Sequence, residues 1–134
     1  MKFRHLIVAI CMSMVFGLTS KAAQAEGGNF MYYGFEPDII TNYISTGKKL
    51  GFVRVTIELM VEGENNLKIM EHHAPLLRAA LVDVLGRQPE ERVKSLAGRE
   101  EIRKLCFTTV NQLLKKETGQ ELAAELLFTK YIYH

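Results

Sequence analysis

The sequence has 134 residues, of which 48% are hydrophobic, and this is enough for one domain with its own core. It contains 17 basic and 15 acidic residues, but Lys2, Arg4 and Lys21 lie in the first 25 positions, so residues 26–134 hold 14 basic and 15 acidic side chains. This near-neutral balance, without a basic stripe, argues against a nucleic-acid-binding protein. Cys106 is the only cysteine after residue 25, so residues 26–134 cannot form a disulfide within the chain.

The first 25 residues have the layout of a secretory signal peptide. Lys2 and Arg4 give a positive start, an apolar run covers residues 6–18, and an Ala-Gln-Ala sequence ends at Ala25. The apolar run is shorter than the roughly 20 residues that span a bilayer as a helix. We therefore predict cleavage between Ala25 and Glu26, with a short membrane anchor as the alternative, and one domain over residues 26–134.

Residues 30–44 are predicted to form two short strands, because Gly34 and Pro37 interrupt a segment rich in aromatic and β-branched residues. We interpret the aromatic side chains as sheet and core packing, and a ligand or membrane-interface patch is the alternative. The aromatic residues concerned are Phe30, Tyr32, Tyr33 and Phe35.

The clearest strand covers residues 52–63, in which apolar and polar side chains alternate with a period of two. Arg54 and Glu58 fall on the outer face, where we expect a solvated cross-strand ion pair. The predicted inner face consists of Val53, Val55, Ile57, Leu59 and Val61.

A long helical pattern follows over residues 67–86, with an apolar stripe at helical spacing and Gly86 as the expected C-terminal cap. Pro75 is unusual inside a helix, because it removes one backbone hydrogen bond and crowds the carbonyl of Glu71. We expect either a kink at Pro75 or two segments that meet near His73.

Two further helices and a last strand complete the chain. Pro89 is expected at the first position of a short helix, and residues 97–118 form a third helix that Gly119 ends. Residues 123–134 favour a strand. The predicted buried face of the third helix consists of Ile102, Leu105, Cys106, Thr109, Val110, Leu113 and Leu114. The order of strands, helices and strand predicts an α+β domain, with a small mixed or antiparallel sheet covered on one face by two or three helices.

The adjacent residues Glu71, His72 and His73 suggest a metal or proton-transfer site at first sight. Adjacent positions on a helix point about 100° apart, however, and a zinc site needs three or four converging ligands. The only other histidine after residue 25 is His134, and the sequence has no HExxH, CxxC or GxSxG motif. We predict no catalytic residue, metal or cofactor, and therefore a protein that is not an enzyme.

Several short motifs together resemble the flagellar basal-body-associated FliL family from Tyr32 to His134. The matching residues are His73, Pro75 and Leu77-Arg78 in the long helix, Gly98-Arg99 and Asn111 in the last helix, and Phe128, Thr129 and Tyr131 in the last strand. Each motif is weak alone, and their order and spacing carry the resemblance.

The resemblance implies a non-enzymatic protein that supports the stator and motor in flagellum-dependent motility. It implies a periplasmic, stomatin-like domain at the inner membrane that self-associates into a ring and contacts stator and basal-body proteins. It also makes several charged side chains candidate interface residues, namely Arg78, Asp83, Arg87, Arg92 and Arg99.

The N-terminal segment departs from the family pattern of a full transmembrane helix followed by a longer linker. This departure favours a soluble periplasmic form over stator encirclement by an anchored protein. A periplasmic binding or adaptor module without a flagellar role, with the sheet face or the aromatic segment as its ligand surface, is the alternative function.

Overall fold

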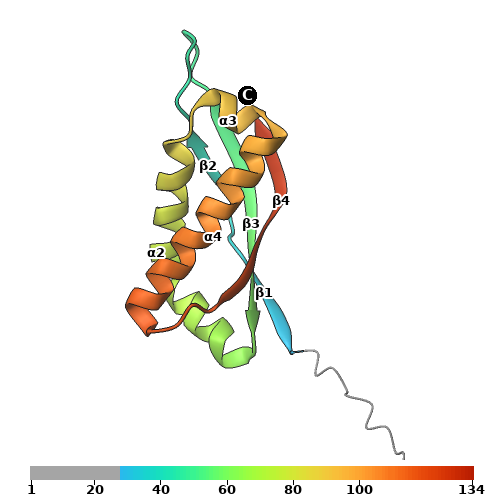
Figure 1. The fold of residues 1–134 in the computed structure, drawn as a ribbon, viewed down its shortest axis with the longest axis vertical. Helices are drawn as coiled ribbons and strands as arrows, with labels where there is room; N and C mark the ends of the chain where they lie inside the picture. The colour runs from blue at the N-terminus through green and yellow to red at the C-terminus, as the bar shows by residue number, and fades with distance from the viewer. Residues whose placement is uncertain (1–27) are drawn as a thin grey trace, which may run out of the picture.

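The computed structural model describes residues 28–134, so the predicted signal peptide and its cleavage site lie outside the described residues (Figure 1). The elements, in chain order, are β1 (Phe30–Gly34), β2 (Ile39–Asn42), β3 (Phe52–Glu62), α2 (Glu64–Gly86), α3 (Glu90–Lys94), α4 (Leu96–Thr118) and β4 (Ala123–Tyr133). Strands, helices and a last strand follow one another as the sequence predicts, which confirms the α+β class.

The sheet is antiparallel and β3 is its centre. β4 pairs with one edge of β3, while β1 and β2 pair one after the other along the opposite edge. Phe30 lies opposite Glu62 at one end of that edge, and Asn42 lies opposite Phe52 at the other. The break between β1 and β2 falls at the predicted place, between Gly34 and Ile39.

The inner face of the sheet carries the core. All five aliphatic side chains that the alternation in β3 assigned to this face are fully buried. Helices α2 and α4 lie across the same face (Figure 1). They contribute the buried side chains of Met70, Ala74, Leu77, Leu81 and Leu85 from α2 and of Ile102, Cys106, Val110 and Leu114 from α4.

The predicted buried face of α4 is wrong at Leu105, which is 42% exposed, while Thr109 and Leu113 are partly buried. The buried apolar side chains are Ile102 and every fourth residue after it, and the other buried positions are Gly98 and Asn111, so the apolar contact stripe is narrower than the apolar pattern of the sequence. Leu105 lies beside this stripe rather than on it.

Pro75 lies inside one uninterrupted helix, so the alternative of two segments is wrong. Its ring is exposed, which leaves the unpaired carbonyl of Glu71 on the solvent side of α2. Gly86 is also not the expected cap, because it is the last helical residue and Arg87 follows with a right-handed backbone. Gly119, by contrast, ends α4 as predicted, with a φ of 83° and its N–H donated to the carbonyl of Lys115.

The junction of α3 and α4 needs a glycine at position 98. Ser95 caps α4 by accepting a hydrogen bond from the N–H of Gly98 at 3.0 Å. A Cβ at position 98 would lie 2.1 Å from the carbonyl oxygen of Arg92. Backbone cannot move away as a flexible side chain can, so a larger residue at position 98 would force the junction of α3 and α4 to shift.

We expect Gly98→Ala to lower the free energy of unfolding by about 1–3 kcal/mol, the usual cost of overpacking. Gly86→Ala is the matched control, because a Cβ there would meet its nearest atoms at 3.5 Å. That variant is expected to be neutral or up to about 1 kcal/mol more stable, from helix propensity. Urea unfolding followed by circular dichroism measures both, and equal midpoints for the two variants would contradict this account.

Candidate interaction surfaces

The face of the sheet away from the helices carries an unusual number of exposed apolar side chains. An antiparallel sheet that faces water normally presents polar residues. Here five large apolar side chains project from three strands and the end of β4, with exposed fractions between 40% and 58%. We call this surface the outer sheet face, and its apolar members are Phe30, Tyr32, Ile40, Phe52 and Ile132.

A charged cluster divides the outer sheet face into two apolar halves. The Asp38 carboxylate accepts hydrogen bonds from Thr56 Oγ1 and Arg54 Nε, both at 2.7 Å, and lies 3.6 Å from Lys130 Nζ. The hydrogen bonds from Thr56 and Arg54 hold the pKa of Asp38 below its ordinary value. Arg54 of β3 therefore forms an ion pair with Asp38, directly before the neighbouring strand β2, which agrees with the cross-strand pair expected from the strand pattern.

Arg78 holds the same region from the helix side of the sheet. Its guanidinium donates to the carbonyl oxygen of Pro37 at 2.7 Å and to that of Asp38 at 3.1 Å. The side chain is half-buried, and it joins the middle of α2 to the break between β1 and β2. This candidate interface residue thus has a clear role within the chain.

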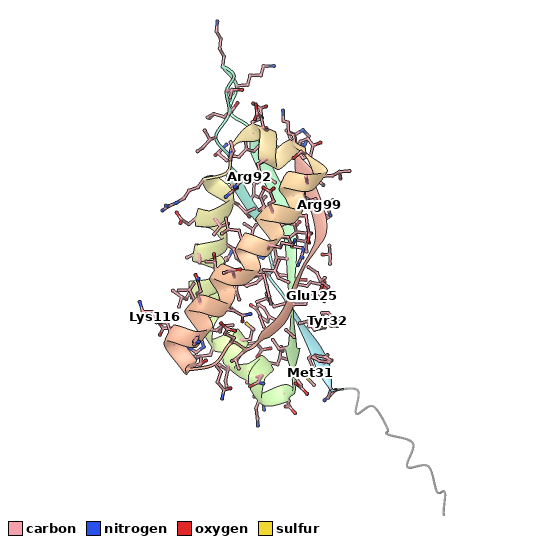
Figure 2. All side chains as sticks on the ribbon, viewed as in Figure 1. Met31, Tyr32, Arg92, Arg99, Lys116 and Glu125 are labelled. Carbon is pink, nitrogen blue, oxygen red and sulfur yellow. The ribbon has the colours of Figure 1, made fainter. Side chains whose placement is uncertain are left out.

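The other four candidate interface residues are dispersed over the helices. Asp83 and Arg87 form an exposed ion pair on α2, with 3.0 Å between Asp83 Oδ1 and Arg87 Nε. Arg92 lies 3.3 Å from a carboxylate oxygen of Glu101, and the Arg99 guanidinium stands 5.1 Å from the centre of the Tyr131 ring. Figure 2 shows Arg92 and Arg99 at the same end of the molecule. The structure does not bring the five residues into one patch, and their place in an interface stays a prediction.

The two histidines on α2 do not converge. Their rings stand nearly perpendicular, with centres 5.1 Å apart, and His73 Nδ1 lies 2.8 Å from the carbonyl oxygen of Ile69. This contact uses one of the two nitrogens of His73 within its own helix. Within residues 28–134, no three histidine, cysteine, aspartate or glutamate side chains are grouped so that they could hold a metal ion.

Cys106 is fully buried in α4, as its apolar surroundings predicted. Burial raises the pKa of its thiol to about 12. Since the thiolate is the reactive form, this cysteine is chemically quiet at neutral pH.

Two side chains of α4 that sequence reasoning did not single out for this role satisfy backbone groups at the edge of β4. Buried Asn111 donates to the carbonyl of Ala123 at 2.9 Å and accepts from its N–H at 3.0 Å. Arg103 donates to the carbonyl of Leu126 at 3.0 Å. The sequence places the polar Asn111 next to apolar helix positions, and this could have indicated a buried hydrogen-bonding residue. Its partner could not be predicted, because it depends on how β4 packs against α4.

We expect Asp38→Asn to lower the urea midpoint at neutral pH, because it removes the charge that Arg54 and Lys130 face. The pKa of Asp38 in the folded state lies below its ordinary value of 3.8, so its stabilising effect is complete above that value. The effect disappears as the pH falls through the folded pKa, and the wild-type advantage should therefore shrink below about pH 4.

Asp83→Asn is the control for this experiment, because Asp83 belongs to an exposed pair that contributes little. The difference in urea midpoint between the wild type and Asp38→Asn should shrink in acid. A difference that stays constant or grows there would contradict the proposed role of the carboxylate.

Comparison with known proteins agrees with the resemblance seen in the sequence. A family model described as "Flagellar basal body-associated protein FliL" matches residues 32–133, which is most of the chain and spans β1 to β4. No curated protein matches the chain. None of the helices within residues 28–134 is both long and apolar enough to cross a membrane. The chain therefore belongs to the FliL family, a non-catalytic family of flagellar basal-body-associated proteins.

Proposed function

We propose that this protein is a non-enzymatic accessory protein that supports the stator and motor during flagellum-dependent motility. The family match over residues 32–133 is the observation that carries this proposal. The outer sheet face supports it as well, because its exposed apolar side chains on either side of the Asp38 cluster are suited to docking.

The outer sheet face is the contact surface for a stator or basal-body protein, or for a second copy of the chain within a ring. A strand spacing of about 4.8 Å and a rise of about 3.3 Å per residue give this face an area on the order of 500 Å². A stable interface buries about 800 Å² on each partner, so the face supplies a large share of one. Covering the Asp38 cluster has a desolvation cost, which the contacts of its carboxylate with Arg54, Thr56 and Lys130 offset in part.

The proposed location is the periplasm, at the inner membrane beside the basal body. Residues 1–25 act as a signal peptide that is cleaved between Ala25 and Glu26, or as a short anchor, and residues 26–134 form the periplasmic domain. Mass spectrometry of the native N-terminus separates the two forms, because cleavage leaves Glu26 first and an anchor retains the first residues.

A periplasmic binding or adaptor module without a flagellar role is the second candidate. The exposed rings of Phe30 and Tyr32 favour it, since aromatic side chains on a sheet can form a ligand surface. The family match favours the basal-body role. Motility is the property on which the two candidates differ.

We expect deletion of the gene to reduce swimming and swarming in viscous medium, and the wild-type gene to restore both. The double variant Tyr32→Ser/Ile40→Ser is expected to fail to restore motility, although exposed positions of this kind change folding stability little. Leu105→Ser, at an exposed apolar position on α4, should restore it. Normal motility of the deletion strain would favour the second candidate. Full restoration of motility by the double variant would show that the outer sheet face is not the contact surface.

A further inference from the structure

A pocket is lined by α3 and by the loop of residues 45–51. Figure 1 shows these two segments at the same end of the molecule. The volume of the pocket is about 450 Å³, within the range of ligand-binding pockets. We call it the tip pocket, and its lining residues are contributed by the end of β2, the loop, α3 and the end of the chain. The lining side chains that matter for its chemistry are Tyr43, Lys48, Lys49, Leu50, Glu90 and Lys94.

The walls of the tip pocket are tied together by hydrogen bonds. The Glu90 carboxylate accepts from Thr46 Oγ1 at 3.0 Å and from Lys94 Nζ at 2.6 Å, which joins the loop to α3. The Tyr43 hydroxyl donates to the carbonyl oxygen of His134 at 2.6 Å. The pocket is therefore formed by elements that are held in place before any partner arrives.

Lysine side chains make the loop side of the tip pocket positive. Glu90 is satisfied by Thr46 and Lys94, so it neutralises only the lysine that it already holds. Lys48 and Lys49 are exposed, and neither forms an ion pair with any of residues 28–134. Two unneutralised ammonium groups at one rim favour a partner that brings carboxylates.

Leu50 adds an apolar contact beside the two ammonium groups. Its side chain is 84% exposed and lines the same pocket. A lone exposed leucine needs no explanation. Leu50, however, lies beside two unpaired lysines in the same pocket, so a partner can make an apolar and a charged contact there at once.

We propose that the tip pocket docks an acidic protein segment, with its carboxylate against Lys48 and Lys49 and a neighbouring aliphatic side chain on Leu50. The concave shape favours a protein segment over a bilayer, because a flat lipid surface cannot enter a pocket between a loop and a helix. This site lies at the opposite end of the sheet from the start of β1 and does not depend on the flagellar role (Figure 1).

The test is an NMR titration of the purified protein with an acetylated and amidated Gly-Glu-Leu-Glu-Gly peptide, which follows the amides of Gly47 and Gly51. Lys48→Ala/Lys49→Ala should weaken binding about tenfold, since it removes both exposed ion pairs with the peptide carboxylates. Leu50→Ser should weaken it about threefold or more, from lost apolar contact. High salt should weaken wild-type binding as well.

The matched control is Lys115→Ala/Lys116→Ala, which removes an adjacent lysine pair from the far end of α4, where Figure 2 shows Lys116. This control should bind as the wild type does, and a peptide with glutamine in place of glutamate should bind at least tenfold more weakly. Absence of peptide binding, equal binding of the glutamine peptide, or equal loss in the control would overturn the proposal. A protein that does not bind the peptide, but binds phosphatidylglycerol vesicles through Lys48, Lys49 and Leu50, would also overturn the proposal.

Discussion

Every other strand of the sheet hydrogen-bonds to β3, and the register of this one strand decides which side chains meet the helices. Side chains in a strand alternate between faces, so a shift by one residue would exchange the two faces completely. The five fully buried aliphatic residues of β3 make such a shift very costly, because it would expose them and bury Arg54 and Glu58. The same constraint creates the outer sheet face, since each residue between the buried ones must point away from the helices.

Each of the two long helices covers the inner face and also protects one edge of the sheet. Arg78 of α2 donates to the carbonyls of Pro37 and Asp38 on one edge, and Arg103 and Asn111 of α4 bind backbone groups of β4 on the other. Backbone groups at a sheet edge otherwise attract strands from other molecules. These contacts satisfy backbone groups at the β1–β2 break and at the first residues of β4, while the outer sheet face carries most of the exposed large apolar side chains of the strands.

Local patterns in the sequence predict most of the fold. The period of two in β3, the helical stripe of α2 and the glycine at position 119 each rest on neighbouring residues, and the structure agrees with them. The predictions of a buried Leu105 and of a helix cap at Gly86 are wrong. At both places tertiary packing decides which of several neighbouring residues is buried or ends the helix. The Asp38 cluster could not be predicted, because its members come from the β1–β2 break, β3 and β4 and meet only through the strand register. The tip pocket likewise depends on how a loop, a short helix and the end of the chain come together.

We propose that a partner covers the outer sheet face in the assembled basal body. Labelling with a membrane-impermeant maleimide in cells tests this claim, in a Cys11→Ser background with one new cysteine at a time. Buried Cys106 contributes little background, since the pKa of its thiol is about 12. We expect Ile40→Cys to label more slowly in cells with basal bodies than in cells without them, and Leu105→Cys to label equally in both. Equal labelling of Ile40→Cys in the two strains would contradict the claim, and absence of labelling at both positions in both strains would contradict the periplasmic location.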